Sequence, residues 1–245
     1  MQNFKKKLIV ISLLLVCILI FSIFQLLRIY NEKKKTISQF EELKSIIEST
    51  PSQIGKENQK YLKIKEKNND FVGWLTIEGT NIDYPVMQSL DNPEFYLRHN
   101  FYKEKDKSGV PFASSTSSIP NGDNIIIFGH NMKNDTMFSD LQKFKSQKFL
   151  EENHQISFNT LTTSYKYDVI MVIKISESDT REFPYYKYSS FDNITAEKYL
   201  SKAKKYSIWS SNEKINDNTK LITLSTCEYT IKNGRLVIIA KKSSD

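Results

Sequence analysis

The C-terminal part of the chain brings together two residues that are able to do covalent chemistry. Leu221–Thr226 and Arg235–Ala240 are short runs of apolar and β-branched residues, and an Asn-Gly turn signal lies between them. This pattern predicts two antiparallel strands that place Cys227 opposite Arg235, on one face of the sheet. A cation beside a thiol lowers the thiol's pKa or holds negative charge that develops on a substrate oxygen. The pair therefore favours a cysteine nucleophile over simple packing.

Three histidines compete for the role of acid or base beside that thiol. His130 follows an apolar run and a glycine, so it emerges where a buried strand ends and a loop begins. His99 lies in a polar and aromatic loop, and His154 follows two glutamates in a setting typical of surface histidines. Position favours His130 and leaves the other two open.

The remaining residue types limit the chemistry. Cys17 and Cys227 are the two cysteines, and Cys17 lies in an apolar run, so no disulfide is expected between them. The alternative for Cys227 is a small buried apolar residue. The chain has no HxxxH or CxxC pattern and no glycine-rich phosphate loop, so we expect no metal site and no cofactor.

The charge of the chain is concentrated near its N-terminus. Residues 1–35 hold seven lysines and arginines against one glutamate, which accounts for +6 of the formal charge of +7. This basicity flanks Leu8–Leu27, an uncharged run of the length that a helix needs to cross a bilayer at about 1.5 Å per residue. The pattern predicts a transmembrane helix and excludes a nucleic-acid groove, because no basic stripe remains in the rest. Basic residues on both sides leave its orientation undecided.

The rest of the chain divides into a helical segment and a β-rich domain. The helical segment has an amphipathic first piece, predicted to be a solvated stalk, then a break at Thr50-Pro51 and Gly55 and a second piece expected to pack on the domain. About eight short strands without βα alternation predict a closed or nearly closed barrel. Besides the two strands above, we predict strands over Phe71–Ile77, Asn81–Val86, Val110–Ala113, Asn124–Phe128, Gln155–Asn159 and Tyr165–Ile175, and helices over Asp135–Glu152 and Thr195–Ser210.

Several motifs in a fixed order resemble those of a known family. TLSTC at a strand end, the NGRLV strand after it and GHNM far upstream resemble a sortase. The segments FVGWLTIEGTNIDYPVMQ and FYLRHNFYKEKDKSG, and the long helical insertion before TLSTC, resemble class B. The resemblance covers about Asp70 to the C-terminus. It implies a mainly β fold, an eight-stranded sortase-type β-barrel with N-terminal helices and a helix in the long connection before the cysteine strand.

The resemblance also implies an activity and a site. Class B sortases are cysteine transpeptidases that cleave an NPxTN-like sorting signal at threonine, form a thioester and pass the protein to a cell-wall amine. By similarity, the catalytic residues are Cys227, His130 and Arg235, and the peptide-binding residues are Leu97, Ser225 and Glu228. The sequence does not decide whether the thiol has a lowered pKa or whether a small thiolate fraction suffices.

The implied partners and location follow from the same resemblance. The partners are secreted proteins with a C-terminal sorting signal, a peptidoglycan precursor or cross-bridge amine, and the membrane. Residues 1–7 form a cytoplasmic tail, 8–27 the membrane span, 28–69 the helical segment and 70–245 an extracellular catalytic domain in a Gram-positive bacterium.

Other functions remain open at this point. A sortase-like pilin polymerase would use the same site. A papain-like cysteine peptidase is disfavoured because its cysteine precedes its histidine, whereas here His130 precedes Cys227. A non-catalytic surface protein, with a basic segment that holds anionic lipid, would leave Cys227 and Arg235 as packing residues.

Overall fold

The computed structural model describes residues 2–50 and 57–243. Helix α1 (Gln2–Ser49) covers both the predicted span and the first helical piece without a break. Within Phe4–Ser49 it contains a window with a mean hydropathy of 2.9, long and apolar enough to cross a membrane. The predicted break at Pro51 and Gly55 lies outside the described residues. A compact unit begins at Phe40.

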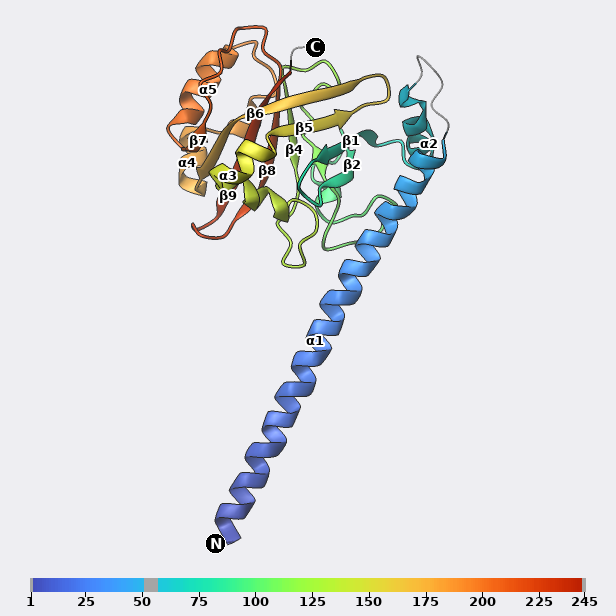
Figure 1. Cartoon of the computed structure of the whole chain (residues 1–245), viewed down its shortest axis with the longest axis vertical. Coiled ribbons are helices and arrows are strands. Elements are labelled where there is room, and N and C mark those ends of the chain that lie inside the picture. The colour runs from blue at the N-terminus through green and yellow to red at the C-terminus, as the bar shows by residue number, and fades with distance from the viewer. Residues whose placement is uncertain (1, 51–56, 244–245) are drawn as a thin grey trace. The chain divides into compact units, whose positions relative to one another are not determined.

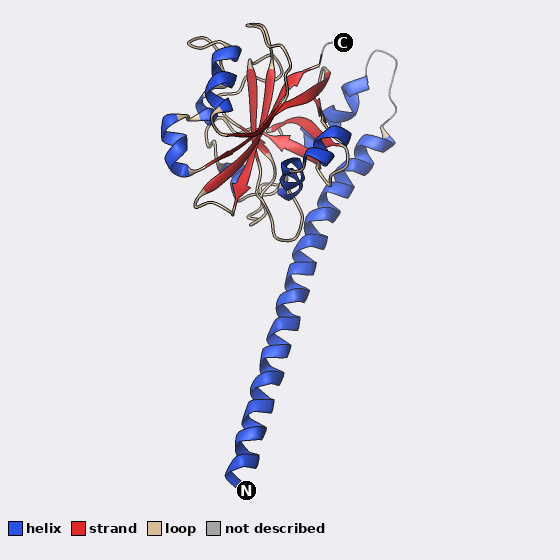
Figure 2. Ribbon diagram, turned by 60° about the vertical axis from the view of Figure 1, so that its left-hand side comes forward, coloured by secondary structure: helices blue, strands red, loops and turns tan. Residues whose placement is uncertain are grey.

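Eight strands of this unit form a closed barrel, and a ninth strand adds to it (Figure 2). The barrel order is β5-β1-β2-β3-β4-β8-β9-β6, and it is closed by the pairing of β5 with β6, while β7 pairs with β6 outside the ring. This confirms the predicted barrel. The strands are β1 (Phe71–Ile77), β2 (Asp83–Met87), β3 (Phe112–Ala113), β4 (Asn124–Phe128), β5 (Gln155–Asn159), β6 (Ser164–Ile175), β7 (Ser207–Ser210), β8 (Leu221–Glu228) and β9 (Gly234–Lys242).

The helices are more numerous than the sequence predicts, so "mainly β" understates them. The expected helix over Asp135–Glu152 is a 3₁₀ helix followed by a short α-helix, and the expected helix over Thr195–Ser210 ends at Lys204 and gives way to β7. The remaining helical elements are η1 (Glu57–Gln59), α2 (Lys60–Lys67), η2 (Phe95–Leu97), η3 (Ser139–Lys145), α3 (Gln147–Glu152), α4 (Glu177–Glu182), η4 (Tyr185–Lys187) and α5 (Ala196–Lys204).

Strand β9 separates two apolar clusters. Leu236 and Ile238 belong to the barrel interior, whereas Val237 and Ile239 pack in a second cluster with α5 on the outer face. Successive side chains of a strand point to opposite faces, so β9 is buried on both sides and reads as a continuous apolar run. In Figure 1, α4, α5 and β7 lie together on this side of the barrel.

The segment before β1 contributes to the barrel core. Phe40 and Leu43 are buried, so the prediction of a solvated stalk is wrong for this end of α1. The two apolar side chains follow helical spacing, and their burial against the barrel stabilises the folded state. Tyr61 and Ile64 of α2 are buried in the same cluster, which confirms that the second piece packs on the domain.

Candidate active site

The hairpin of β8 and β9 has the register that the sequence predicts. Cys227 pairs with Arg235, so the thiol and the guanidinium leave the same face of the sheet. Asn233 in the connecting turn has φ of +51°, a conformation that asparagine tolerates better than most residues. Its side-chain amide donates a hydrogen bond to the Glu177 carboxylate of α4. The turn is therefore held from both its backbone and its side chain.

A second register places His130 beside Cys227. Strands β4 and β8 are parallel and pair Phe128 with Ser225, so two residues further along both strands are His130 and Cys227. Gly129, which precedes His130, lies against the Phe138 ring. A Cβ at this position would be only 2.6 Å from that ring. A larger residue would displace the start of the His130 loop.

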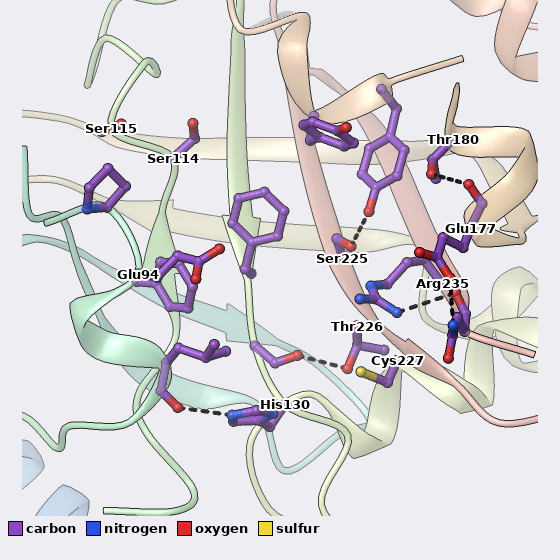
Figure 3. Close-up of a pocket in the computed structure, with 18 residues that line it drawn as sticks. Glu94, Ser114, Ser115, His130, Glu177, Thr180, Ser225, Thr226, Cys227 and Arg235 are labelled. Atoms are coloured by element: carbon purple, nitrogen blue, oxygen red, sulfur yellow. Dashed lines mark hydrogen bonds between the residues drawn. The ribbon is translucent and has the colours of Figure 1, made fainter. Parts of the chain in front are cut away.

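These three side chains line one groove of about 750 Å³. Figure 3 shows the thiol of Cys227 between the imidazole of His130 and the guanidinium of Arg235. The groove lies over the ends of three neighbouring strands, β4, β8 and β9. Segments separated by about a hundred residues thus supply a nucleophile, an acid or base and a cation to one cleft.

The imidazole of His130 is oriented by a backbone carbonyl. Its Nε2 lies 2.9 Å from the carbonyl oxygen of Leu97, and since a carbonyl only accepts, Nε2 carries the hydrogen. The other ring nitrogen, Nδ1, is left to exchange a proton. Burial lowers the pKa of His130, the Leu97 carbonyl opposes this by raising it, and the positive charge of Arg98 lowers it further. The net effect is to lower the pKa of His130 from its ordinary value, which favours the neutral imidazole.

The guanidinium of Arg235 is anchored to its own turn. Its Nη1 donates to the carbonyl oxygens of Gly234 at 3.0 Å and of Asn233 at 3.4 Å. These bonds use one nitrogen of a planar fork that has five donor hydrogens. A guanidinium held in this way can present further N–H groups to an oxygen in the groove.

The predicted peptide-binding residues are placed differently from one another. Leu97 and Ser225 line the groove, but Glu228 is not among its lining residues. The Glu228 carboxylate is buried and lies 2.7 Å from the Lys145 ammonium. Burial alone would raise the pKa of Glu228, but hydrogen bonds from Lys145 and Thr230 lower it to about 2. This setting favours a structural ion pair, and peptide binding by Glu228 stays a prediction.

Sequence reasoning missed one wall of the groove. Glu177 and Thr180 of α4 line the groove together with Tyr185 and Tyr186 of η4, and Figure 3 shows Glu177 and Thr180 on the side opposite Glu94. The hydroxyl of Tyr185 lies 2.7 Å from that of Ser225, and burial raises the pKa of Tyr185, which keeps it protonated. The capping box of Ser176 and Asp179 was a readable signal for α4. No sequence signal distinguishes the two tyrosines from core aromatic residues.

The other two histidines lie elsewhere. The ring of His99 stacks on Phe95 with ring centroids 3.9 Å apart, and its Nδ1 lies 2.7 Å from the Phe95 carbonyl oxygen. His154 is exposed and outside the groove. Within residues 2–50 and 57–243, no group of three or more His, Cys, Asp or Glu side chains is arranged to hold a metal ion.

Comparison with known proteins agrees with this geometry. Residues 75–243 match the sortase domain. Sortase B of Listeria monocytogenes is 38% identical over 181 residues, which cover 73% of this chain and 72% of that protein. Sortase B of Staphylococcus aureus is 28% identical over 245 residues, 98% of both chains. The crystal structure of Clostridium perfringens sortase B has a TM-score of 0.67 at 35% identity, covering 75% of this chain and 99% of that one.

The chain belongs to the sortase family. Its relatives and structural neighbours are of class B, which agrees with the helices before the barrel and in the connection before β8. It is therefore a sortase-type cysteine transpeptidase of class B.

Proposed function

We propose that this transpeptidase cleaves an NPxTN-like sorting signal at its threonine and joins the released protein to a cell-wall amine through a thioester on Cys227. The observation that carries the proposal is the convergence of Cys227, His130 and Arg235 on one groove from three adjacent strands. The groove has a volume of about 750 Å³, and its lining includes both Leu97 and Tyr186.

The first half-reaction forms the thioester. The Cys227 thiolate attacks the threonine carbonyl carbon, and the oxygen becomes an oxyanion that accepts hydrogen bonds from Arg235. The carbon–nitrogen bond then breaks. His130, as the imidazolium, gives its Nδ1 proton to the departing amine and becomes neutral.

The second half-reaction transfers the acyl group. Neutral His130 takes a proton from the incoming amine, whose nitrogen attacks the thioester carbonyl. The carbon–sulfur bond breaks as the new amide forms, and the thiolate of Cys227 is released. The imidazolium is thereby restored. The thioester escapes hydrolysis by water as long as the amine attacks it first.

The lowered pKa of His130 sets the protonation requirement of the first step. At neutral pH the imidazolium is a minority form, because burial and Arg98 disfavour its charge. Each half-reaction uses a different protonation state of His130, so a pKa below neutrality favours the amine-activating step.

The location proposed for this reaction is the outer face of a bacterial membrane. The apolar window of α1 supports a membrane span. The proposed orientation, with residues 1–7 inside and the domain from residue 70 outside, follows from the resemblance to class B sortases. The substrates are then secreted proteins with a C-terminal sorting signal and a peptidoglycan precursor or cross-bridge amine. This topology places the groove in the compartment where both substrates occur.

One experiment tests the proposal. The full chain, purified in detergent, is given a fluorogenic NPxTN-type peptide with and without a short glycine or diamino-acid amine. We expect cleavage that is lost in Cys227→Ala, and an amine-linked product in place of the free acid when the amine is present. Hydrolysis indifferent to the amine would indicate a peptidase instead, and absence of turnover would contradict the sorting-signal assignment.

A further inference from the structure

The loop that carries His130 continues the pairing of β4 with β8 beyond the end of β4. The backbone N–H of Gly129 donates to the carbonyl of Ser225 at 3.1 Å, as in a regular parallel ladder. In such a ladder the next donor would be the N–H two residues on, bonded to the carbonyl of Cys227. Instead, the side-chain amide of Asn131 donates to that carbonyl at 2.9 Å. The asparagine side chain thus takes the place of a strand N–H.

Asn131 also accepts a hydrogen bond from the residue that follows β8. The hydroxyl of Tyr229 donates to the Asn131 carbonyl oxygen at 3.0 Å. On the other side of His130, the hydroxyl of Thr226 donates to the Gly129 carbonyl at 2.8 Å. Both neighbours of His130 are therefore hydrogen-bonded to the strand end that carries Cys227. The imidazole follows any displacement of that strand end.

We propose that Asn131 is a positioning residue that holds the imidazole of His130 beside the thiol of Cys227. The inference rests on the proposed function, because it assigns Asn131 to the proton-transfer geometry of that reaction. Loss of its side-chain amide removes the direct hydrogen bond between Asn131 and the Cys227 carbonyl and leaves this residue tied to the strand end through Tyr229. Misplacement of a proton donor by about 1 Å is enough to cost one to two orders of magnitude in rate.

A second donor to the same carbonyl supplies the matched control. The side-chain amide of Gln142, on η3, donates to the Cys227 carbonyl at 3.2 Å. Gln142→Ala removes one hydrogen bond from this oxygen, as Asn131→Ala does, but it leaves the His130 loop attached. A role in merely satisfying the carbonyl predicts equal effects of the two variants. A positioning role predicts unequal ones.

The test compares steady-state transpeptidation by the full chain in detergent, in a Cys17→Ser background. We expect Asn131→Ala to lower kcat about tenfold or more with KM for the sorting peptide unchanged, and Gln142→Ala to lower it no more than about threefold. The rate of Cys227 alkylation by iodoacetamide, followed against pH, should lose its His130 inflection in Asn131→Ala and keep it in Gln142→Ala. Equal losses of kcat in both variants, or a retained inflection in Asn131→Ala, would overturn the proposal.

Two further measurements keep the test decisive. Tyr229→Phe removes the bond to the Asn131 carbonyl from a side chain that is 70% exposed, so it should fold normally and lower kcat about two- to fivefold. If Asn131→Ala does not fold, an unchanged kcat in Tyr229→Phe rejects the positioning role. Failure of the parent protein to turn over any sorting peptide would count against the proposed function, whereas the alkylation profiles need no peptide and still decide the role of Asn131.

Discussion

The groove is built from two regions that are held in different ways. Its floor is the end of β4, β8 and β9, where backbone ladders fix Cys227 and Arg235 by register and hold β4 up to two residues before His130. Its far wall is the connection from α4 to η4, which is held by side-chain hydrogen bonds and by stacked aromatic rings such as Phe183 and Tyr206. A ladder tolerates side-chain changes, whereas a wall of this kind depends on each contact.

The two regions are therefore expected to have different roles in catalysis. Groups that exchange protons or hold charge must keep their places within a fraction of an ångström, which strand pairing provides. Groups that contact a peptide can be supplied by a connection that adapts its side chains. Variants of the floor should therefore lower kcat, and variants of the far wall should raise KM.

The largest effect is expected for the proton-transfer residue of the floor. His130→Ala should lower kcat by about 10²- to 10⁴-fold, because it removes the imidazole that lines the groove beside Cys227 and is assigned the proton transfer to the departing amine. Steady-state assays with the sorting peptide and an amine measure this. The matched control, His154→Ala, changes an exposed histidine outside the groove and should retain parental rates. A loss of similar size in the control would remove His130 from its assigned role.

The next effect concerns the cation of the floor. Arg235→Lys should lower kcat by about 10²-fold, the scale of losing one oxyanion donor, because an ammonium lacks the planar fork that Arg235 anchors on its turn. Arg181→Lys, on the exposed side of α4, provides the control. Near-parental kcat in Arg235→Lys would show that the guanidinium does not contact the oxyanion.

A smaller effect is expected in the far wall. Tyr185→Phe removes the hydroxyl that lies against Ser225 and should raise KM about three- to tenfold while kcat stays within about twofold. The lost hydrogen bond should also lower the free energy of unfolding by about 1 kcal/mol. The control is Tyr165→Phe, since Tyr165 of β6 is half-buried and is not among the residues that line the groove. If Tyr185→Phe lowers kcat instead, the division between floor and far wall fails.

The smallest effect is a shift in pH dependence. Arg98 lowers the pKa of His130, so Arg98→Ala should raise that pKa and move the acidic limb of kcat/KM to higher pH. An NMR titration of the His130 ring measures the shift directly. Since the pKa of His130 is lowered in the folded state, the stability that depends on neutral His130 is present above the ordinary pKa of a histidine and is lost as the pH falls through the lowered value. An unmoved or lowered pKa in Arg98→Ala would contradict the assigned cause.

The sequence predicts the floor better than the far wall, and the reason is physical. The apolar runs of β4, β8 and β9 are buried on both faces, and the Asn-Gly signal sets the turn, so Cys227 opposite Arg235 follows from local patterns. To predict that His130 lies beside Cys227, one must also know that β4 pairs in parallel with β8, a strand about a hundred residues away. No local pattern specifies that pairing, and the family resemblance supplied it.

The structure of the far wall, like that of β7 and the surroundings of Glu228, is determined by tertiary contacts. Residues 207–210 continue the helical pattern of α5, yet they form β7 because the free edge of β6 offers backbone hydrogen bonds. Glu228 looks like a solvated carboxylate in sequence, but its side chain is buried and pairs with the more exposed Lys145, which is 83 residues away. Tyr185 contacts Ser225 across 40 residues. Propensity and spacing carry no information on such contacts.

The central claim is that the thiol of Cys227 carries the acyl group between two amines, and the intact mass of the protein tests it most directly. After incubation of the full chain with an NPxTN-type peptide and no amine, the account predicts an adduct of the acyl fragment on Cys227. Addition of a glycine or diamino-acid amine should discharge this adduct and yield an equal amount of amide product. Turnover without any adduct on Cys227, or an adduct that amines leave unchanged, would contradict it.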